Sequence, residues 1–217
     1  MLISLAACGG DDSPDAAEQL QQRAQDGLLA SYSATYAIAG AEGADGGQVS
    51  VWRTPTTLRL DVRTDAGTST SITTPQESVA CQVPSNGKRP TCLRVAGPGQ
   101  TPPEAFDPVL RKVFGDALRV LANDDNGLTI TSATATPTPG ATAPTAAVTE
   151  DVDCFAVTAP SDQQKIASGT YCLTTDGIPV AMSFPSGDVT ATELTRATPE
   201  PSTFVPTTSP TPLPTRS

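Results

Sequence analysis

Short segments in which apolar and polar residues alternate are the feature that most constrains the fold of this chain. In the clearest one, Leu58, Leu60 and Val62 alternate with charged residues, which is the pattern of a β-strand with one buried face. Similar segments recur, and turn-forming pairs such as Asp176-Gly177 separate them. The pattern predicts antiparallel strands at residues 32–39, 49–52, 58–63, 69–74, 78–83, 92–95, 128–134, 153–158, 170–174, 179–184 and 189–196.

Two other segments have helical periodicity. The first is predicted to begin at Ser13-Pro14-Asp15, where an N-cap precedes a proline and an acidic residue. Its apolar positions are Ala17, Leu20, Ala24 and Leu28. The second follows Asp107-Pro108, ends at residues 123–127, and carries a wide apolar stripe of Leu110, Val113, Phe114, Ala117, Leu118 and Leu121. We expect this stripe to pack against the inner face of the sheet.

Four of the five cysteines fall in predicted strands, as two pairs. Cys81 and Cys92 flank a turn centred on Asn86-Gly87, and counting outward from that turn places them opposite each other. Cys154 and Cys172 likewise lie in two neighbouring strand-like segments. The sequence therefore predicts two structural disulfides in an oxidising compartment. A metal site made of four thiolates is the alternative, and the absence of any C-x-x-C spacing disfavours it.

The remaining cysteine, Cys8, follows Leu5-Ala6-Ala7 in a pattern that resembles a bacterial lipobox. On this interpretation residues 1–8 are a truncated signal peptide with its lipobox, Cys8 carries a diacylglyceryl anchor, and residues 9–13 are a polar tether. The protein would then be extracytoplasmic and anchored to the cell membrane by lipid. The alternative is that Cys8 is an ordinary cysteine of a flexible N-terminus.

Composition excludes several classes of function. The formal net charge of −10 argues against nucleic acid as a partner. Histidine is absent, which rules out Ser-His-Asp and Cys-His catalysis and histidine-ligated metals. The remaining polar candidates are best explained as solvated turns or chance pairs, namely Glu150-Asp151-Asp153, Asp124-Asp125, and Lys165 with Ser161 or Ser168. We therefore expect no enzyme activity, no cofactor, no metal and no catalytic residue.

Two segments are rich in threonine and proline, a composition typical of disorder. We expect a folded domain at residues 14–198, with a disordered insertion at 135–148 and a disordered tail at 199–217.

The segment Val51-Trp52-Arg53-Thr54-Pro55-Thr56-Thr57-Leu58-Arg59-Leu60-Asp61 resembles an early hairpin of the LolA/LolB-like lipoprotein-carrier superfamily. This superfamily includes the LppX/LprG-type bacterial lipoproteins. The turn Thr175-Asp176-Gly177-Ile178-Pro179 is similar to a later hairpin of the same domains. The resemblance implies an α+β fold, in which a curved, incompletely closed antiparallel β-sheet (a half-barrel) holds helices packed in its concave face. It also implies binding or carriage of a lipid or acyl chain without catalysis.

A hydrophobic ligand would lie against the apolar side chains of the sheet and the second helix. The residues expected to line or gate the cavity are Trp52, Leu58, Leu60, Val62, Phe114 and Leu118. The simpler interpretation is that each fills the core. The alternative function is an envelope sensor or protein-interaction lipoprotein without a ligand cavity, in which an exposed Trp52 would contact an envelope protein partner.

Overall fold

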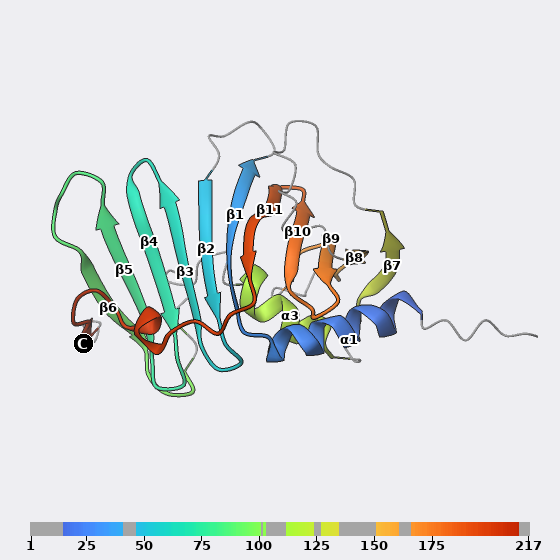
Figure 1. Ribbon diagram of the computed structural model, residues 1–217, viewed down its shortest axis with the longest axis horizontal. Coiled ribbons are helices and arrows are strands. Elements are labelled where there is room, and N and C mark those ends of the chain that lie inside the picture. The colour runs from blue at the N-terminus through green and yellow to red at the C-terminus, as the bar shows by residue number, and fades with distance from the viewer. Residues whose placement is uncertain are drawn as a thin grey trace, which may run out of the picture.

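The fold is a wide, open β-sheet with helices on one face. The computed structural model describes residues 15–40, 47–100, 102, 112–123, 127–134, 151–160 and 166–212. It contains one 12-stranded sheet with the strand order β12-β6-β5-β4-β3-β2-β1-β11-β10-β9-β8-β7, which does not close into a barrel (Figure 1). All neighbouring strands are antiparallel except β12 and β6. The architecture confirms the α+β half-barrel.

Strands β1 to β11 coincide with the segments whose alternation predicts them, because turn residues define the strand ends locally, whereas β12 was not predicted. For example, the Thr54–Pro55 turn between β2 and β3 is closed by a hydrogen bond from Thr54 N–H to the Thr57 carbonyl at 2.9 Å. The strands are β1 Tyr32–Gly40, β2 Gly47–Arg53, β3 Leu58–Thr64, β4 Gly67–Thr73, β5 Ser78–Pro84, β6 Thr91–Ala96, β7 Thr129–Ala133, β8 Val152–Thr158, β9 Gly169–Thr174, β10 Pro179–Phe184, β11 Gly187–Thr195 and β12 Thr211–Pro212.

Among the described residues, the helical elements that accompany the sheet are α1 Ala16–Leu29, the π-helical turn η2 Lys112–Asp116, α3 Ala117–Leu121, and the 3₁₀ turn η4 Pro201–Phe204. The N-cap of α1 is Asp15, whose carboxylate accepts a hydrogen bond from Glu18 N–H at 2.8 Å. Ser13, predicted as the cap, lies outside the described residues, as does the start of the second helix before residue 112. In the described part of the chain no helix is long and apolar enough to span a membrane.

The apolar side chains change faces between β3 and β4. In β1 to β3 the buried apolar residues face α1 and α3, as Val51 and its cross-strand neighbour Leu60 do. The next neighbour in that row is Ser71 of β4. In β4 and β5 the buried apolar residues Ile72 and Val79 project from the opposite face. We call the two sides the helix face and the strap face.

The helix face holds the main core. η2 and α3, which we call the cover helix (Lys112–Leu121), contribute Phe114, Leu118 and Leu121 to the same cluster as Leu20 and Ala24 of α1. The Phe114 ring stacks at a tilt on Tyr36 of β1, with 4.6 Å between ring centroids. Figure 1 shows α1 running past the ends of β10 and β9 toward β7, with α3 beside it. The second helix therefore packs on the sheet as its stripe predicts.

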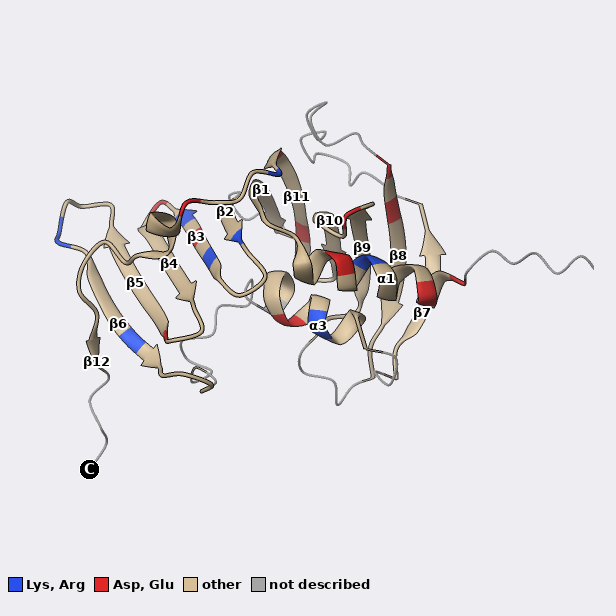
Figure 2. Ribbon diagram, turned by 60° about the horizontal axis from the view of Figure 1, so that its bottom comes forward, with Lys and Arg blue, Asp and Glu red and all other residues tan. Residues whose placement is uncertain are grey.

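The strap face is covered by the C-terminal segment. Residues 198–212, which we call the strap, leave β11, cross β3 to β5 and end as β12 on the outer edge of β6 (Figure 2). Phe204 of η4 is buried against Ile72, Val79 and the Cys81–Cys92 pair. The prediction of a disordered tail from residue 199 is therefore wrong as far as residue 212, because one buried aromatic residue and a short strand fix the segment. Residues 213–217 and the predicted insertion at 135–148 lie outside the described residues.

Both predicted disulfides are present. Cys81 faces Cys92 across β5 and β6, and Cys154 faces Cys172 across β8 and β9, each with 4.0 Å between Cα atoms. Each bridge lies close to one edge of the open sheet. On the chain-entropy model each closed loop stabilises the fold by roughly 3 kcal/mol. The two bridges indicate an oxidising, extracytoplasmic compartment.

Helix α1 docks on the β9–β10 turn through two glycines. A Cβ at Gly27 would collide with the carbonyl oxygen of Gly177, and Gly177 has a φ of 75° that favours glycine. Arg23 of α1 fixes the same junction, because it donates to the Thr175 carbonyl at 2.5 Å and to Asp153 at 2.6 Å. The Asp176-Gly177 turn is thus both a hairpin turn and a seat for the helix.

We expect Gly27→Ala to lower the free energy of unfolding by about 2 kcal/mol. Alanine gains about 1 kcal/mol in helix propensity, but the collision with backbone atoms costs more than that gain. Gly97→Ala is the control, because a Cβ there meets only the flexible Gln100 side chain, at 3.3 Å. Urea unfolding of the three proteins measures the difference. A Gly27→Ala protein as stable as the parent would contradict the close helix–turn contact.

Candidate functional site

The structure brings together four of the six predicted cavity residues. Leu58, Leu60, Phe114 and Leu118 are buried in one cluster between β3 and the cover helix. Val62 is half-buried at the margin of that cluster. All five lie on the helix face, where they fill the space between the sheet and the cover helix.

Trp52 was expected in the same cavity, and that expectation is wrong. It lies on the strap face, half-buried beside the cluster that contains Phe204. The Arg59 guanidinium stacks over its ring, 5.2 Å from the ring centroid. The physical reason is alternation: Trp52 lies between Val51 and Arg53, and both of these face the helices.

Arg53 is a charged residue inside the main core that sequence reasoning missed. It continues the inward-facing series Val49, Val51 on β2 and is only 4% exposed. Its Nη1 donates to the Phe114 carbonyl of the cover helix at 2.8 Å, whereas its Nε–H is buried with no hydrogen-bond partner among the described residues. Burial lowers the pKa of Arg53. The signal available in the sequence was an arginine at an inward position of an alternating strand.

Two buried tyrosines of β1 lie beside Arg53. The Tyr36 hydroxyl donates to the Pro179 carbonyl at 2.7 Å. The Tyr32 hydroxyl is fully buried and makes no hydrogen bond of acceptable geometry in the described structure, although it lies near Tyr36. Burial raises the pKa of both phenols, and the nearby Arg53 charge offsets this in part. The cover helix therefore rests on a polar cluster with two unused donors, the Arg53 Nε–H and the Tyr32 hydroxyl.

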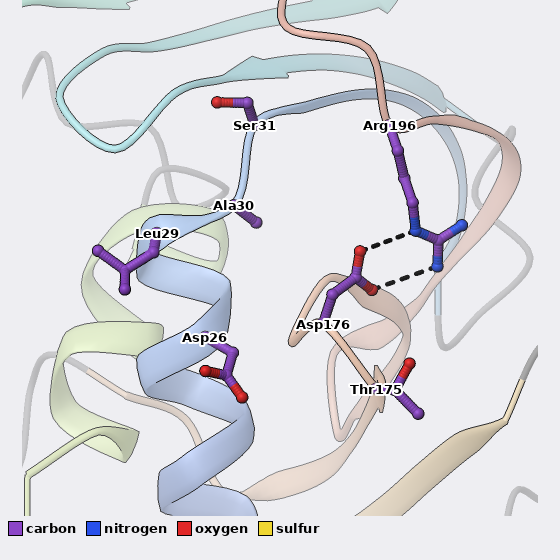
Figure 3. A pocket seen from close by; sticks show the side chains of 7 residues that line it. All are labelled: Asp26, Leu29, Ala30, Ser31, Thr175, Asp176 and Arg196. Atoms are coloured by element: carbon purple, nitrogen blue, oxygen red, sulfur yellow. Dashed lines mark hydrogen bonds and ion pairs between the residues drawn. The ribbon is translucent and has the colours of Figure 1, made fainter.

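A shallow pocket of about 490 Å³ lies elsewhere, between the end of α1 and the β9–β10 turn (Figure 3). Leu29 lines one side of this pocket, and its side chain is 73% exposed. On the other side Asp176 and Arg196 form a two-point ion pair, with N···O distances of 2.7 and 3.2 Å. Burial raises the pKa of Asp176, but hydrogen bonds from Arg196 and Thr174 outweigh it and leave the pKa below its usual value. The pocket is open, its one arginine is paired with Asp176, Asp26 accepts hydrogen bonds from Gln22 of α1, and none of the predicted cavity residues lines it.

Three of the polar residues considered for catalysis lie in the described part of the chain, namely Asp151, Asp153 and Ser168. Asp153 is paired with Arg23 of α1, and the Ser168 hydroxyl accepts a hydrogen bond from Ala159 N–H at 2.9 Å. Asp151 is exposed just before β8, whereas Glu150, Asp124, Asp125, Ser161, Lys165 and the predicted anchor Cys8 lie outside the described residues. Within the described ranges, no three cysteine or acidic side chains are close enough together to hold a metal ion.

Comparison with known proteins identifies the fold. No protein family model matches the sequence, and a search of curated proteins finds no significant match. A crystal structure of MucB matches 91% of this chain with a TM-score of 0.53 and 16% sequence identity. This chain covers 64% of that MucB chain, which is less than two thirds of its length. At this identity the likeness shows the fold alone, and it supports the LolA-like half-barrel.

Two further MucB structures match less well. They are the MucA/MucB complex of Pseudomonas aeruginosa and MucB in complex with MucA(peri), at 14% and 12% identity. Each match covers 88% of this chain and 60% of the other, with TM-scores of 0.49 and 0.48. Scores this low add nothing to the argument.

All three tyrosines of the chain are buried, and this predicts a loss of stability in base. Burial raises the pKa of Tyr32, Tyr36 and Tyr171 in the folded protein, whereas unfolded tyrosines ionise near pH 10. Above about pH 10 the unfolded state has therefore lost protons that the folded state keeps, and the free energy of unfolding falls. The expected slope is about 1.4 kcal/mol per pH unit for each tyrosine.

Urea unfolding at a series of pH values, with phenolate absorbance as a second signal, measures this effect. The phenolate signal should appear only together with unfolding. Tyr32→Phe is the matched control, because it removes one buried phenol hydroxyl and keeps the buried ring. It should preserve stability at neutral pH and reduce the slope by one tyrosine's share. Phenolate absorbance that rises while the protein stays folded would contradict the burial.

Proposed function

We propose that this protein is a non-catalytic, extracytoplasmic binding protein that takes an apolar chain, such as the acyl chain of a lipid, between β1–β3 and the cover helix. The observation that carries the proposal is the buried and incompletely bonded Arg53 under the cover helix. The membrane anchor is a separate part of the proposal and rests on the sequence from Leu5 to Cys8.

Burial of Arg53 under the cover helix is unfavourable in free energy. A buried cation with an unused donor costs several kcal/mol relative to an apolar side chain. This cost is subtracted from the free energy that the apolar contacts of Phe114 and Leu118 contribute to docking the cover helix. The cover helix is therefore held less firmly than an all-apolar interface of the same size would hold it. A ligand chain can replace Phe114 and Leu118 against Leu58 and Leu60 when the cover helix moves away.

The alternative is a protein-interaction module that holds no ligand. In its favour, Leu58, Leu60, Phe114 and Leu118 are buried together in the main core. Binding of lipid by the full-length protein distinguishes the two.

Native mass spectrometry of the full chain, purified from its own host, is the direct test. We expect a non-covalent lipid at about one copy per protein, lost on denaturation. A diacylglyceryl group on Cys8 would instead persist on denaturation, so the same experiment tests the anchor separately. An empty protein that also refuses added lipids would refute the carrier function and favour the interaction module.

Arg53→Met tests the role of the buried cluster. Methionine removes the buried charge while keeping most of the volume, so we expect the free energy of unfolding to rise by about 1.4 kcal/mol. A closed state stabilised by that amount binds a competing ligand about tenfold more weakly. Arg63→Met is the control, because Arg63 is exposed. A loss of stability in Arg53→Met would mean that the bond to Phe114 stabilises the cover helix rather than weakening it.

A further inference from the structure

The strap makes a compact set of contacts on the face opposite the proposed ligand site. Arg59 is the centre of this set: it donates to the Thr203 carbonyl at 2.8 Å, forms two hydrogen bonds with Asp61 at 2.7 and 2.9 Å, and stacks on Trp52. Phe204 fills the adjacent apolar site formed by Ile72, Val79 and the Cys81–Cys92 bridge. A backbone carbonyl and an aromatic side chain are thus recognised together.

Beyond Phe204 the strap bends at Val205, Thr207 and Thr208 before it reaches β12, and alternate residues of this stretch lie against the sheet. Phe204, Pro206, Thr208 and Pro210 are buried or half-buried, whereas the residues between them are exposed, and Val205 is 60% exposed. The strap then pairs with β6 in parallel, with Thr211 beside Leu93 and Pro212 beside Arg94. The last two residues of the strap are thus added to the sheet edge as a short parallel strand.

The strap is an imperfect occupant of this site. The Thr208 hydroxyl is buried without a hydrogen-bond partner in the described structure. Phe204 is the strap's single large apolar side chain in the buried cluster. The ladder with β12 covers Leu93 and Arg94 of β6, which spans Thr91–Ala96. A segment with an apolar residue in place of Thr208 and a longer strand along β6 would match the site better.

We propose that the strap face is a peptide-recognition site, and that the strap occupies it as a resident, displaceable ligand. The partner is an extended protein segment with an aromatic residue in the Phe204 position and apolar residues at alternate positions after it, continuing as a parallel strand on β6. This site lies on the opposite face of the sheet from the ligand site under the cover helix.

The fluorescence of Trp52 can report on occupancy of the proposed peptide site. Trp52 is the single tryptophan of the chain and lies at the site, and residues 200–212 contain none. In full-length protein, Phe204→Ala should release the strap and shift Trp52 emission to the red. Val205→Ala, at the exposed neighbouring position, is the matched control and should leave the emission unchanged. Far-ultraviolet circular dichroism verifies that both variants fold.

Synthetic peptides of residues 200–212 are then titrated against the Phe204→Ala protein. The native peptide should restore the parent emission. Its Phe204→Ala form should bind at least about 30-fold more weakly, and its Thr208→Val form about 3- to 10-fold more tightly, because the unpaired hydroxyl is removed. The unaltered protein should bind the native peptide at least about tenfold more weakly than the released one, because its own strap competes.

Two results would overturn the proposal: no saturable change in Trp52 emission with any peptide, or equal affinities for all three. Concentration-dependent dimerisation of the unaltered protein through exchanged straps would identify a second copy as the occupant, and would overturn the assignment to a partner. If Phe204→Ala does not fold, the same titrations are made with Phe204→Leu, which keeps an apolar side chain in the site, and the same outcomes apply.

Discussion

The switch of apolar side chains from one face of the sheet to the other, between β3 and β4, is the constraint on which the rest of the structure depends. The pairing of β3 with β4 fixes which side chains share a face. Ser71 pairs with Leu60 and therefore faces the helices as Leu60 does, so the next residue, Ile72, faces the other way. A single layer of helices cannot bury both sets of apolar residues. The sheet therefore needs two covers on opposite faces: the chain supplies the helices from residues 16–29 and 112–121, and the strap from its C-terminal end.

Different interactions hold α1, the cover helix and the strap on the sheet. Helix α1 meets the sheet through backbone contact at Gly27 and Gly177 and through the charged contacts of Arg23, which leaves little room for movement. The cover helix adds apolar burial but rests on the polar group of Arg53. The strap depends on one aromatic side chain, one arginine and a two-residue strand. The contact surfaces of the cover helix and of the strap each include a buried polar atom without a hydrogen-bond partner in the described structure, Arg53 Nε and Thr208 Oγ1 respectively.

The sequence predicts the strands and both disulfides because their determinants are local: a period of two, turn residues, and cysteines counted from a turn. It predicts less of the site. Alternation shows which residues share a face of a strand, but not which segment of the chain packs on that face. Trp52 and Leu58 look equivalent as apolar strand residues, yet they lie on opposite faces. Phe204 is one aromatic residue in a threonine- and proline-rich tail, where composition indicates disorder. Its burial depends on Ile72 and Val79, which are more than a hundred residues away in sequence and project from the face that the helices leave uncovered.

The two covers meet at the same short stretch of backbone. Trp52 and Arg53 are adjacent on β2, and they pair with Arg59 and Leu58 of β3. Arg53 and Leu58 contact the cover helix or its core on one face, while Trp52 and Arg59 contact the strap side on the other. A shift of this backbone that loosens one cover changes the packing beneath the other. Thermodynamic linkage requires any such effect to be reciprocal, so a chain that binds lipid under the cover helix and a peptide on the strap face would transmit each event to the other through four residues of two paired strands.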